Sequence, residues 1–211
     1  METEKARQRR LQEGFFEKYI HGCGVDVGCG ADVVIPDAIQ WDKPLDAHSL
    51  YKPSGEGIAS ASLDFTYSSH CLEDLENPWA AIREWWRVIR PGGHLAILVP
   101  HRNLFECRKT LPSAGNKNHR WFFLLDRNEE PVTLGLVPLV ASVCPDSELI
   151  YAKTCDEGYS VRFQPFKDNP AVIQVIANGE FSIEAVWKKR DITRETFVED
   201  MILPEMMEAT K

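Results

Sequence analysis

The chain has 211 residues, of which 44% are hydrophobic and 27% are charged. These are ordinary values for a globular protein, and they exclude a disordered chain, a collagen-like chain and a coiled rod. Lysine and arginine total 24 against 32 aspartates and glutamates, which gives a net charge of −8. Because nucleic acids and anionic membranes bind basic surfaces, this balance argues against both as general partners. The length predicts one domain over residues 1–211.

The six cysteines form no Cys-x-x-Cys pair, and the N-terminus has no apolar signal core. These features favour a reducing, cytoplasmic compartment, and the cysteine and histidine spacing predicts no metal site. The most apolar stretch, Leu134–Val143, is too short to span a bilayer.

Apolar residues at every fourth position predict a helix over residues 5–20. Leu11, Phe15 and Tyr19 form its buried stripe, and Gly22 and Gly24 follow its end. Basic residues occupy the first half of this helix. The simplest interpretation is a solvated face, with a partner-binding face as the alternative, for Lys5, Arg7, Arg9 and Arg10.

Strands and helices then alternate along the chain. Apolar runs predict strands over residues 25–27, 38–42, 63–67 and 94–100. Asn77 and Pro78 stand in the order of an N-cap and a first helical residue, and the helix that they begin should stop before Pro91. This alternation predicts an α/β sandwich with right-handed crossovers.

The second half of the chain is less regular. We expect a helix near residues 132–143, a strand near 148–155 and a last strand over 181–188. The last strand alternates apolar and polar residues, which is typical of a strand with one exposed face, often an antiparallel one. Residues 171–177 fit either a strand or a short helix.

The first predicted strand ends in a glycine turn, the place where open α/β sheets bind ligands. Gly28 and Gly30 allow a ligand close to the backbone, but neither the third glycine of a dinucleotide fingerprint nor the Lys-Ser pair of a phosphate loop is present. Asp26 brings a carboxylate to the turn, and Asp42 ends the second strand, where an acid can bind ribose hydroxyls. A ligand with a ribose, a positive centre and no phosphate fits both acids, and S-adenosylmethionine is such a ligand.

Three motifs occur in consistent order within residues 10–105: Val25-Asp26-Val27-Gly28-Cys29-Gly30, Tyr67-Ser68-Ser69-His70-Cys71-Leu72-Glu73-Asp74-Leu75 and Trp86-Arg87-Val88-Ile89-Arg90-Pro91-Gly92-Gly93-His94-Leu95. They resemble the motifs of the class I, Rossmann-like S-adenosylmethionine-dependent methyltransferases, and the whole chain looks most like the small stand-alone bacterial type. The resemblance implies a three-layer α/β/α sandwich with a mostly parallel, seven-stranded sheet and an antiparallel last strand. It also implies an N-terminal helix (1–21), a cofactor-binding half (22–105) and an acceptor side (106–211).

The resemblance also implies roles for individual residues toward S-adenosylmethionine. The turn would hold the methionine part and Asp42 the ribose, while the Leu45-Asp46-Ala47 run would meet the adenine and the end of the fourth family strand would line the methyl-donor pocket. The implied cofactor-binding residues are Asp26, Gly28, Cys29, Gly30, Asp42, Asp46, Ala47, Ser69 and His70. For Asp46, a loop acid that caps a turn is the alternative.

The chain departs from the family pattern in two places. Only three residues separate Asp42 from Asp46, so the usual second crossover helix should be missing or reduced to a loop. Asp74 stands where most such chains have a histidine, so any role of that histidine in the family does not carry over to this position.

Methyl transfer to a hydroxyl would be helped by a base, and histidine is the usual type. His70, His101 and His119 are candidates, and His101 and His70 are preferred as catalytic residues because each follows a strand at its carboxyl edge. Residues 101–120 also carry five basic residues against one acid. This predicts an anionic small-molecule acceptor bound with His101, Arg102 and Arg120, or alternatively only a solvated charged loop.

Two other functions compete with a small-molecule methyltransferase. A nicotinamide-dependent oxidoreductase would use a similar sheet, but the missing third glycine and Asp26 argue against it. A catalytically inactive protein that binds S-adenosylmethionine or a partner would keep the same motifs, and the sequence leaves this alternative open.

Overall fold

The structure is a computed structural model that describes residues 2–43, 46–113, 115–157, 159 and 179–192. Its centre is a six-stranded sheet in the order β2-β1-β3-β4-β8-β7. Four neighbouring strands are parallel, namely β2 (Ile39–Trp41), β1 (Gly24–Val27), β3 (Leu63–Ser69) and β4 (Ile89–Pro100). Strand β8 (Ser182–Lys189) runs antiparallel to β4 and to the edge strand β7 (Ser147–Cys155). The predicted mostly parallel sheet with an antiparallel last strand is confirmed, with six strands instead of seven.

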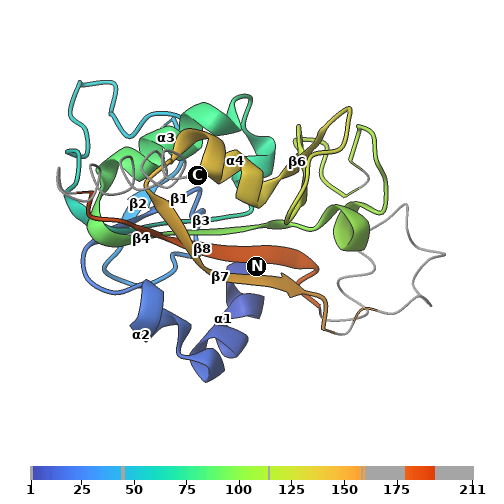
Figure 1. Cartoon of the computed structure of the whole chain (residues 1–211), viewed down its shortest axis with the longest axis horizontal. Helices are drawn as coiled ribbons and strands as arrows, with labels where there is room; N and C mark the ends of the chain where they lie inside the picture. Colours follow the sequence, from blue (N-terminus) through green and yellow to red (C-terminus); the bar gives the residue numbers. More distant parts are fainter. Residues whose placement is uncertain (1, 44–45, 114, 158, 160–178, 193–211) are drawn as a thin grey trace, which may run out of the picture.

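Helices cover both faces of the sheet (Figure 1). Helices α1 (Glu2–Glu13) and α2 (Phe15–Tyr19) lie on one face, and α3 (Pro78–Val88) and α4 (Leu136–Val143) lie on the other. Each face has its own apolar core, with Trp85 and Ile82 under α3 and with Phe15 and Tyr67 under α2. The predicted three-layer α/β/α sandwich is therefore confirmed.

Local signals placed several elements correctly. Asn77 caps α3 as predicted, because its side chain accepts a hydrogen bond from the Ala80 amide at 3.0 Å. The helix ends at Val88, and β4 begins at the next residue, before Pro91. The helix predicted near residues 132–143 divides into a short strand, β6 (Thr133–Gly135), followed by α4, and β6 pairs with β5 (Phe122–Leu124) in a separate two-stranded sheet.

Among the described residues between β2 and β3, one expected strand and its crossover helix are absent. The described residues from 42 to 62 contain no helix and only an isolated bridge between Tyr51 and Gly57. This confirms the loop predicted from the short spacing between Asp42 and Asp46, and it accounts for the lower strand count. Strand β2 therefore becomes a sheet edge, and Ile39 on it is 39% exposed. The ambiguous segment 171–177 lies outside the described residues.

The single helix predicted over residues 5–20 is wrong. Gly14 adopts a left-handed backbone, with φ of 64°, between α1 and α2. This conformation suits glycine and interrupts the helix, so the chain turns and α2 starts in a new direction.

The prediction of a solvated basic face is wrong for Arg9 and Arg10, which are the polar centre of the interface between α1 and the sheet. Arg10 is fully buried and donates hydrogen bonds to Glu184 (2.6 Å) and to the Tyr67 hydroxyl (2.7 Å). Arg9 donates to the other oxygen of Glu184, at 2.8 Å. By contrast, Leu11, which the periodicity placed in the buried stripe, is 54% exposed.

The prediction that β8 has one exposed face is also wrong. Its first six residues are all buried, including Ser182 and Glu184. Glu184, a polar position of the alternating pattern, faces α1 instead of water, and the arginines of α1 supply the hydrogen bonds that a buried carboxylate needs.

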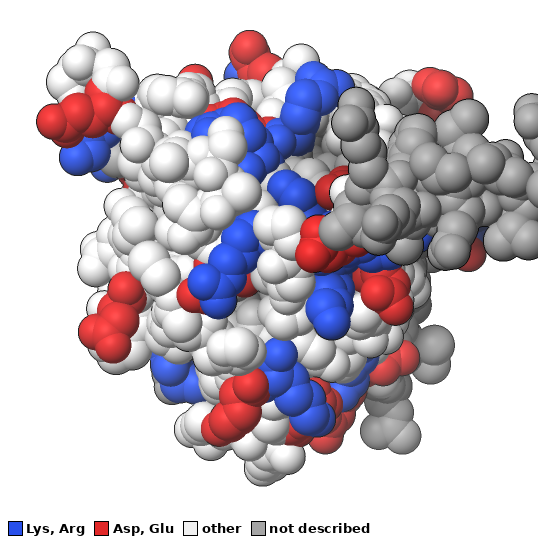
Figure 2. Space-filling view, turned by 60° about the vertical axis from the view of Figure 1, so that its left-hand side comes forward, with Lys and Arg blue, Asp and Glu red and all other residues white. Residues whose placement is uncertain are grey.

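Charged side chains of both signs mix on one face of the molecule. Figure 2 shows a face on which lysine and arginine side chains are interspersed with aspartate and glutamate side chains. No helix within the described residues has the length and apolar character that a bilayer-spanning segment requires.

Replacing Arg10 with methionine should destabilise the protein strongly. The substitution leaves Glu184 buried with only one of its two arginine partners, and breaking a buried pair typically costs about 3–5 kcal/mol, so we expect about 3 kcal/mol with Arg9 still present. Urea unfolding measures the loss. The matched control is Arg90→Met, which removes an exposed arginine from its pair with Asp64 and should cost less than about 1 kcal/mol. Equal losses in the two variants would contradict the central position of Arg10.

Candidate active site

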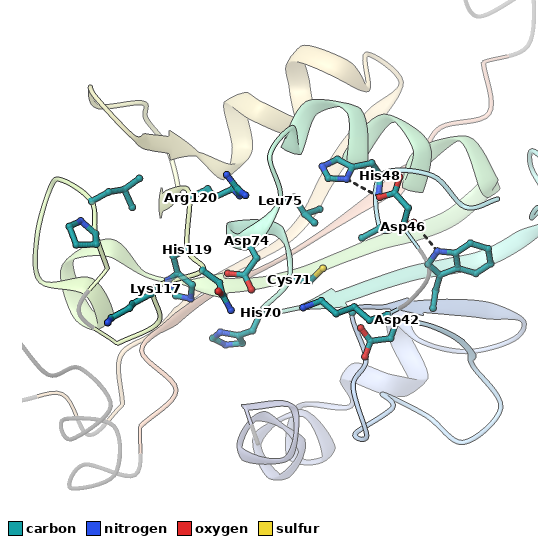
Figure 3. Close-up of a pocket in the computed structure, with 17 residues that line it drawn as sticks. Asp42, Asp46, His48, His70, Cys71, Asp74, Leu75, Lys117, His119 and Arg120 are labelled. Carbon is teal, nitrogen blue, oxygen red and sulfur yellow. Dashed lines mark hydrogen bonds and ion pairs between the residues drawn. The ribbon is translucent and has the colours of Figure 1, made fainter. Parts of the chain in front are cut away.

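A cavity of about 760 Å³ lies at the carboxyl ends of the parallel strands (Figure 3). Its walls come from the loops after β1, β2 and β3 and from the segment before β5. The lining residues include Gly28 and eleven residues with polar or charged side chains, namely Asp42, Lys43, Asp46, His48, His70, Cys71, Asp74, Lys117, Asn118, His119 and Arg120. Open α/β sheets bind ligands at this edge, so the cavity is the default site.

The glycine turn after β1 forms the floor of one end of the cavity. Gly28 has φ of 78°, and a Cβ there would lie 2.5 Å from the Cβ of Cys71. Gly30 has φ of 56°, and a Cβ there would meet nothing nearer than a carboxylate oxygen of Asp42 at 3.9 Å. The first glycine is thus required by packing, whereas the second faces open space beside Asp42. Cys29 between them is nearly buried and is not in the cavity wall.

Asp26 lies under the turn and not in the cavity wall. One of its carboxylate oxygens accepts a hydrogen bond from the Val34 amide at 2.7 Å, and the other is buried without a partner among the described residues. Burial raises the pKa of Asp26 to about 7, and the charges of Asp32 and Asp42 add to the effect.

The two acids after β2 differ in their surroundings. Asp42 lines the cavity, and no described side chain or amide is hydrogen-bonded to its carboxylate. Asp46 is exposed, and one carboxylate oxygen accepts from both the amide (2.9 Å) and the ring (3.0 Å) of His48. The hydrogen bond from the His48 backbone amide is the main cause of the lowered pKa of Asp46. Ala47 lies beside Asp46 in the same wall.

The end of β3 brings His70 into the cavity wall, while Ser69 is buried behind it. His70 has a left-handed backbone, with φ of 51°. Its Nδ1 lies 3.4 Å from Glu73, and its Nε2 lies 3.4 Å from the hydroxyl of Ser182. The ring is therefore held between two neighbours.

The structure does not bring His101 or Arg102 into the cavity wall. The Nδ1 of His101 accepts a hydrogen bond from the Asn103 amide at 3.1 Å, and burial, followed by the charge of Arg102, lowers the pKa of His101. Arg102 is buried and donates to Glu129 (2.8 Å) and to Thr133 (3.2 Å). These contacts of Arg102 hold the short turn after β4 against the β5–β6 sheet.

The basic segment divides into paired and cavity-lining residues. Lys109 joins Arg102 at Glu129, at 3.5 Å, so neither contributes a free charge to the cavity. Lys117 and Arg120 line the cavity. Among the described acids, Arg120 is paired only with the exposed Glu76, at 3.2 Å, and none is paired with Lys117.

Sequence reasoning missed a buried acidic and imidazole cluster behind the cavity. Glu73 and Glu106 are each 1% exposed, and His119 lies between them, 2.5 Å from Glu106 and 3.8 Å from Glu73. Glu73 follows the His70 motif and Glu106 stands in a short turn, where a glutamate is ordinarily solvated, so no local pattern predicts either burial. Within the described chain, no group of three or more histidine, cysteine, aspartate or glutamate side chains could hold a metal ion.

Comparison with known proteins gives a family match over part of the chain and a fold. A family model described as "Methyltransferase domain" matches residues 45–97, which include the loop after β2, β3, α3 and most of β4 but not the glycine turn. No curated protein matches the chain.

Solved structures with the same fold are distant in sequence. The [4+2]-cyclase SpnF has a TM-score of 0.51 and 16% identity, and the match covers 86% of this chain and 80% of that one. A possible histamine N-methyltransferase from Thermotoga maritima has a TM-score of 0.50 and 15% identity, with 90% and 92% covered. A methyltransferase from Haloferax volcanii, in complex with the Trm112 activator, has a TM-score of 0.51 and 10% identity, with 90% and 94% covered. At these identities the likeness establishes the fold.

Replacing Asp26 with asparagine should stabilise the protein above neutral pH. A carboxyl whose pKa is about 7 in the folded state and about 4 in the unfolded state contributes stability below about pH 4 that is lost as the pH rises through 7. The free energy of unfolding of Asp26→Asn, relative to the natural chain, should therefore rise by on the order of 2–4 kcal/mol between about pH 4 and pH 8. Urea unfolding at both pH values measures it. Asp37→Asn, at an exposed loop acid, should show no such trend, and a flat difference for Asp26→Asn would contradict the burial effect.

Proposed function

We propose that this chain transfers a methyl group to a hydroxyl of a small anionic acceptor, such as an acidic or phosphorylated sugar. The family match and the fold support a class I, Rossmann-like S-adenosylmethionine-dependent methyltransferase. The observation that carries the proposal is the separation of charge across one cavity. Asp42 and Asp46 outnumber Lys43 in the loop at one end, Lys117 and Arg120 lie at the other, and His70 and Asp74 lie between them (Figure 3).

The acidic end fits the cofactor that the family and the fold imply. S-adenosylmethionine is cationic at its sulfonium, and its chemistry is to offer an activated methyl group. Gly30 and the free carboxylate of Asp42 border open space, as a ribose requires. One buried oxygen of Asp26 has no partner among the described residues and lies under the same turn. Asp26 would therefore support the turn that holds the methionine part of the cofactor.

The His48 contacts support a positioning role for Asp46. Its carboxylate is tied to the amide and the ring of His48, and its carbonyl accepts from the Trp41 indole at 3.0 Å. These bonds hold the short loop that replaces the missing crossover helix. In this arrangement Asp46 shapes the cavity wall where the adenine would bind. Asp42 supplies the carboxylate that would accept hydrogen bonds from the ribose.

The basic end fits an anion. Lys117 gives a point charge, and Arg120 gives paired donors that suit a carboxylate or a phosphate, while its only described acid, Glu76, is 75% exposed and competes weakly. Arg102, which the sequence placed with these residues, is committed to Glu129 and is left out of the proposed acceptor site. The chain would act mainly by holding the two reactants in line and away from water.

The cofactor assignment predicts binding that depends on Asp42. S-adenosylmethionine and S-adenosylhomocysteine should raise the melting temperature, whereas NADH should not. Asp42→Asn should weaken the binding of S-adenosylhomocysteine by on the order of 1–3 kcal/mol, because charge-assisted hydrogen bonds to the ribose become neutral ones. Titration calorimetry measures the affinity, with Asp37→Asn as the matched control. Unchanged affinity in Asp42→Asn would remove this residue from the site.

The acceptor assignment predicts a dependence on charge and on salt. A screen with labelled S-adenosylmethionine should include glucuronate, a glucose phosphate and a uridine-diphosphate-linked glucuronate, with glucose as the neutral comparison. The anionic acceptors should be turned over better, and Lys117→Ala and Arg120→Ala should each raise KM for them by roughly tenfold or more, with weaker binding in salt. Lys52→Ala, at an exposed lysine outside the cavity wall, should leave KM unchanged. Preference for glucose with no effect of either variant would reject an anionic acceptor, and cofactor binding without any turnover would favour an inactive binding protein.

A further inference from the structure

His119 is held in the cavity wall by a buried carboxylate. Its Nδ1 lies 2.5 Å from one oxygen of Glu106, and the other oxygen of Glu106 accepts a hydrogen bond from the Ser113 hydroxyl at 2.6 Å. The ring also lies near that of Phe105, with 5.8 Å between the centroids. All three polar groups are at least 95% buried, so water cannot easily replace these contacts.

This arrangement determines which nitrogen of His119 is free. A carboxylate at 2.5 Å can only accept, so Nδ1 carries the hydrogen. The nearest acid to Nε2 is Glu73 at 3.8 Å, which is beyond hydrogen-bond distance. The neutral ring therefore keeps its lone pair on Nε2, as a general base requires.

The two other histidines of the cavity wall have no such hydrogen bond to a buried carboxylate. His48 accepts from the Asn77 amide at its Nε2 and contacts Asp46 at its Nδ1. His70 lies between Glu73 and Ser182. His101 has a free Nε2 but is not in the wall. His119 is thus the cavity-lining histidine of the described chain whose ring is oriented by a hydrogen bond to a buried carboxylate.

The charges around His119 also favour a stronger base. The groups that face it are Glu106 from the turn after β4, Glu73 and Asp74 from the turn after β3, His70 through Glu73, and Lys117 and Arg120 from its own segment. Burial opposes a charged imidazole, but the hydrogen bond to Glu106 and the charge of Glu73 outweigh it and raise the pKa of His119.

We infer that His119 is the proton acceptor for the hydroxyl of the acceptor molecule and that Glu106 is the residue that positions it. The inference rests on the proposed function. As the hydroxyl oxygen bonds to the methyl carbon, its proton passes to Nε2 of His119. The carbon–sulfur bond of S-adenosylmethionine breaks, and its electron pair stays on the sulfur. The imidazolium then returns the proton to water.

The first test uses the free protein and needs no acceptor. Nitrogen-15 spectra of the histidines, followed from about pH 5 to pH 9, should show His119 protonated at Nδ1 above its pKa, and that pKa should exceed about 6.5. Glu106→Gln keeps the shape of the side chain and removes the charge, so it should lower the pKa of His119 by about one unit or more. An Nε2-protonated ring, or an unchanged pKa in Glu106→Gln, would overturn the inference.

The second test measures turnover. His119→Asn keeps a hydrogen-bond donor for Glu106 and removes the base, so kcat should fall by roughly 10²–10⁴-fold while the affinity for S-adenosylhomocysteine stays the same. His21→Asn, at an exposed histidine, is the matched control. The pH at which kcat rises should follow the pKa seen in the spectra and should move down in Glu106→Gln, which a purely structural role would not produce.

The outcomes separate the two proposals. A natural chain that binds no S-adenosylhomocysteine fails the proposed function, and the base role fails with it. A natural chain that methylates an acceptor while His119→Asn does so equally well fails only the base role. If His119→Asn does not fold, the spectra and the pH profile of Glu106→Gln decide.

Discussion

The carboxylate of Glu184 is the constraint around which one face of the protein is organised. It is buried in β8, the strand that joins the parallel part of the sheet to its antiparallel edge. A buried carboxylate requires charged or polar partners, and Arg9 and Arg10 supply them from α1. This requirement places α1 against the sheet, aligns Arg10 with Tyr67 on β3 and brings its positive charge toward Asp26 under the glycine turn.

The elements that the sequence predicted well have local causes. The cap of α3 depends on residues 77–80, and the loop after β2 depends on a spacing of three residues. The elements that it predicted poorly depend on contacts between distant residues. The helical periodicity assigned Arg10 to solvent because its partner is 174 residues away. The alternation of apolar and polar residues assigned one face of β8 to solvent for the same reason. Gly14 was a local signal that the helical pattern outweighed.

The candidate site shows the same division. The strand ends at which parallel strands place their loops were predictable, and they bring Gly28, Asp42 and His70 to one cavity. The residues that bind the methyl acceptor were not predictable, because they depend on which basic and acidic side chains of the second half form ion pairs with one another. Arg102 was a reasonable ligand until Glu129 paired with it, and His119 was one candidate of three until Glu106 fixed its ring. Neither partner carries a pattern that distinguishes it from a solvated glutamate.

The separation between Arg10 and Glu184 has a consequence for synthesis of the protein. Helix α1 is synthesised before β8, and the carboxylate that Arg9 and Arg10 share follows Arg10 by 174 residues. Contacts of such long range delay folding, because the entropy of closing the intervening chain is lost before the contact forms. The arginine-bearing face of α1 and the strand positions that it covers therefore stay exposed to chaperones until almost the whole described chain has been translated.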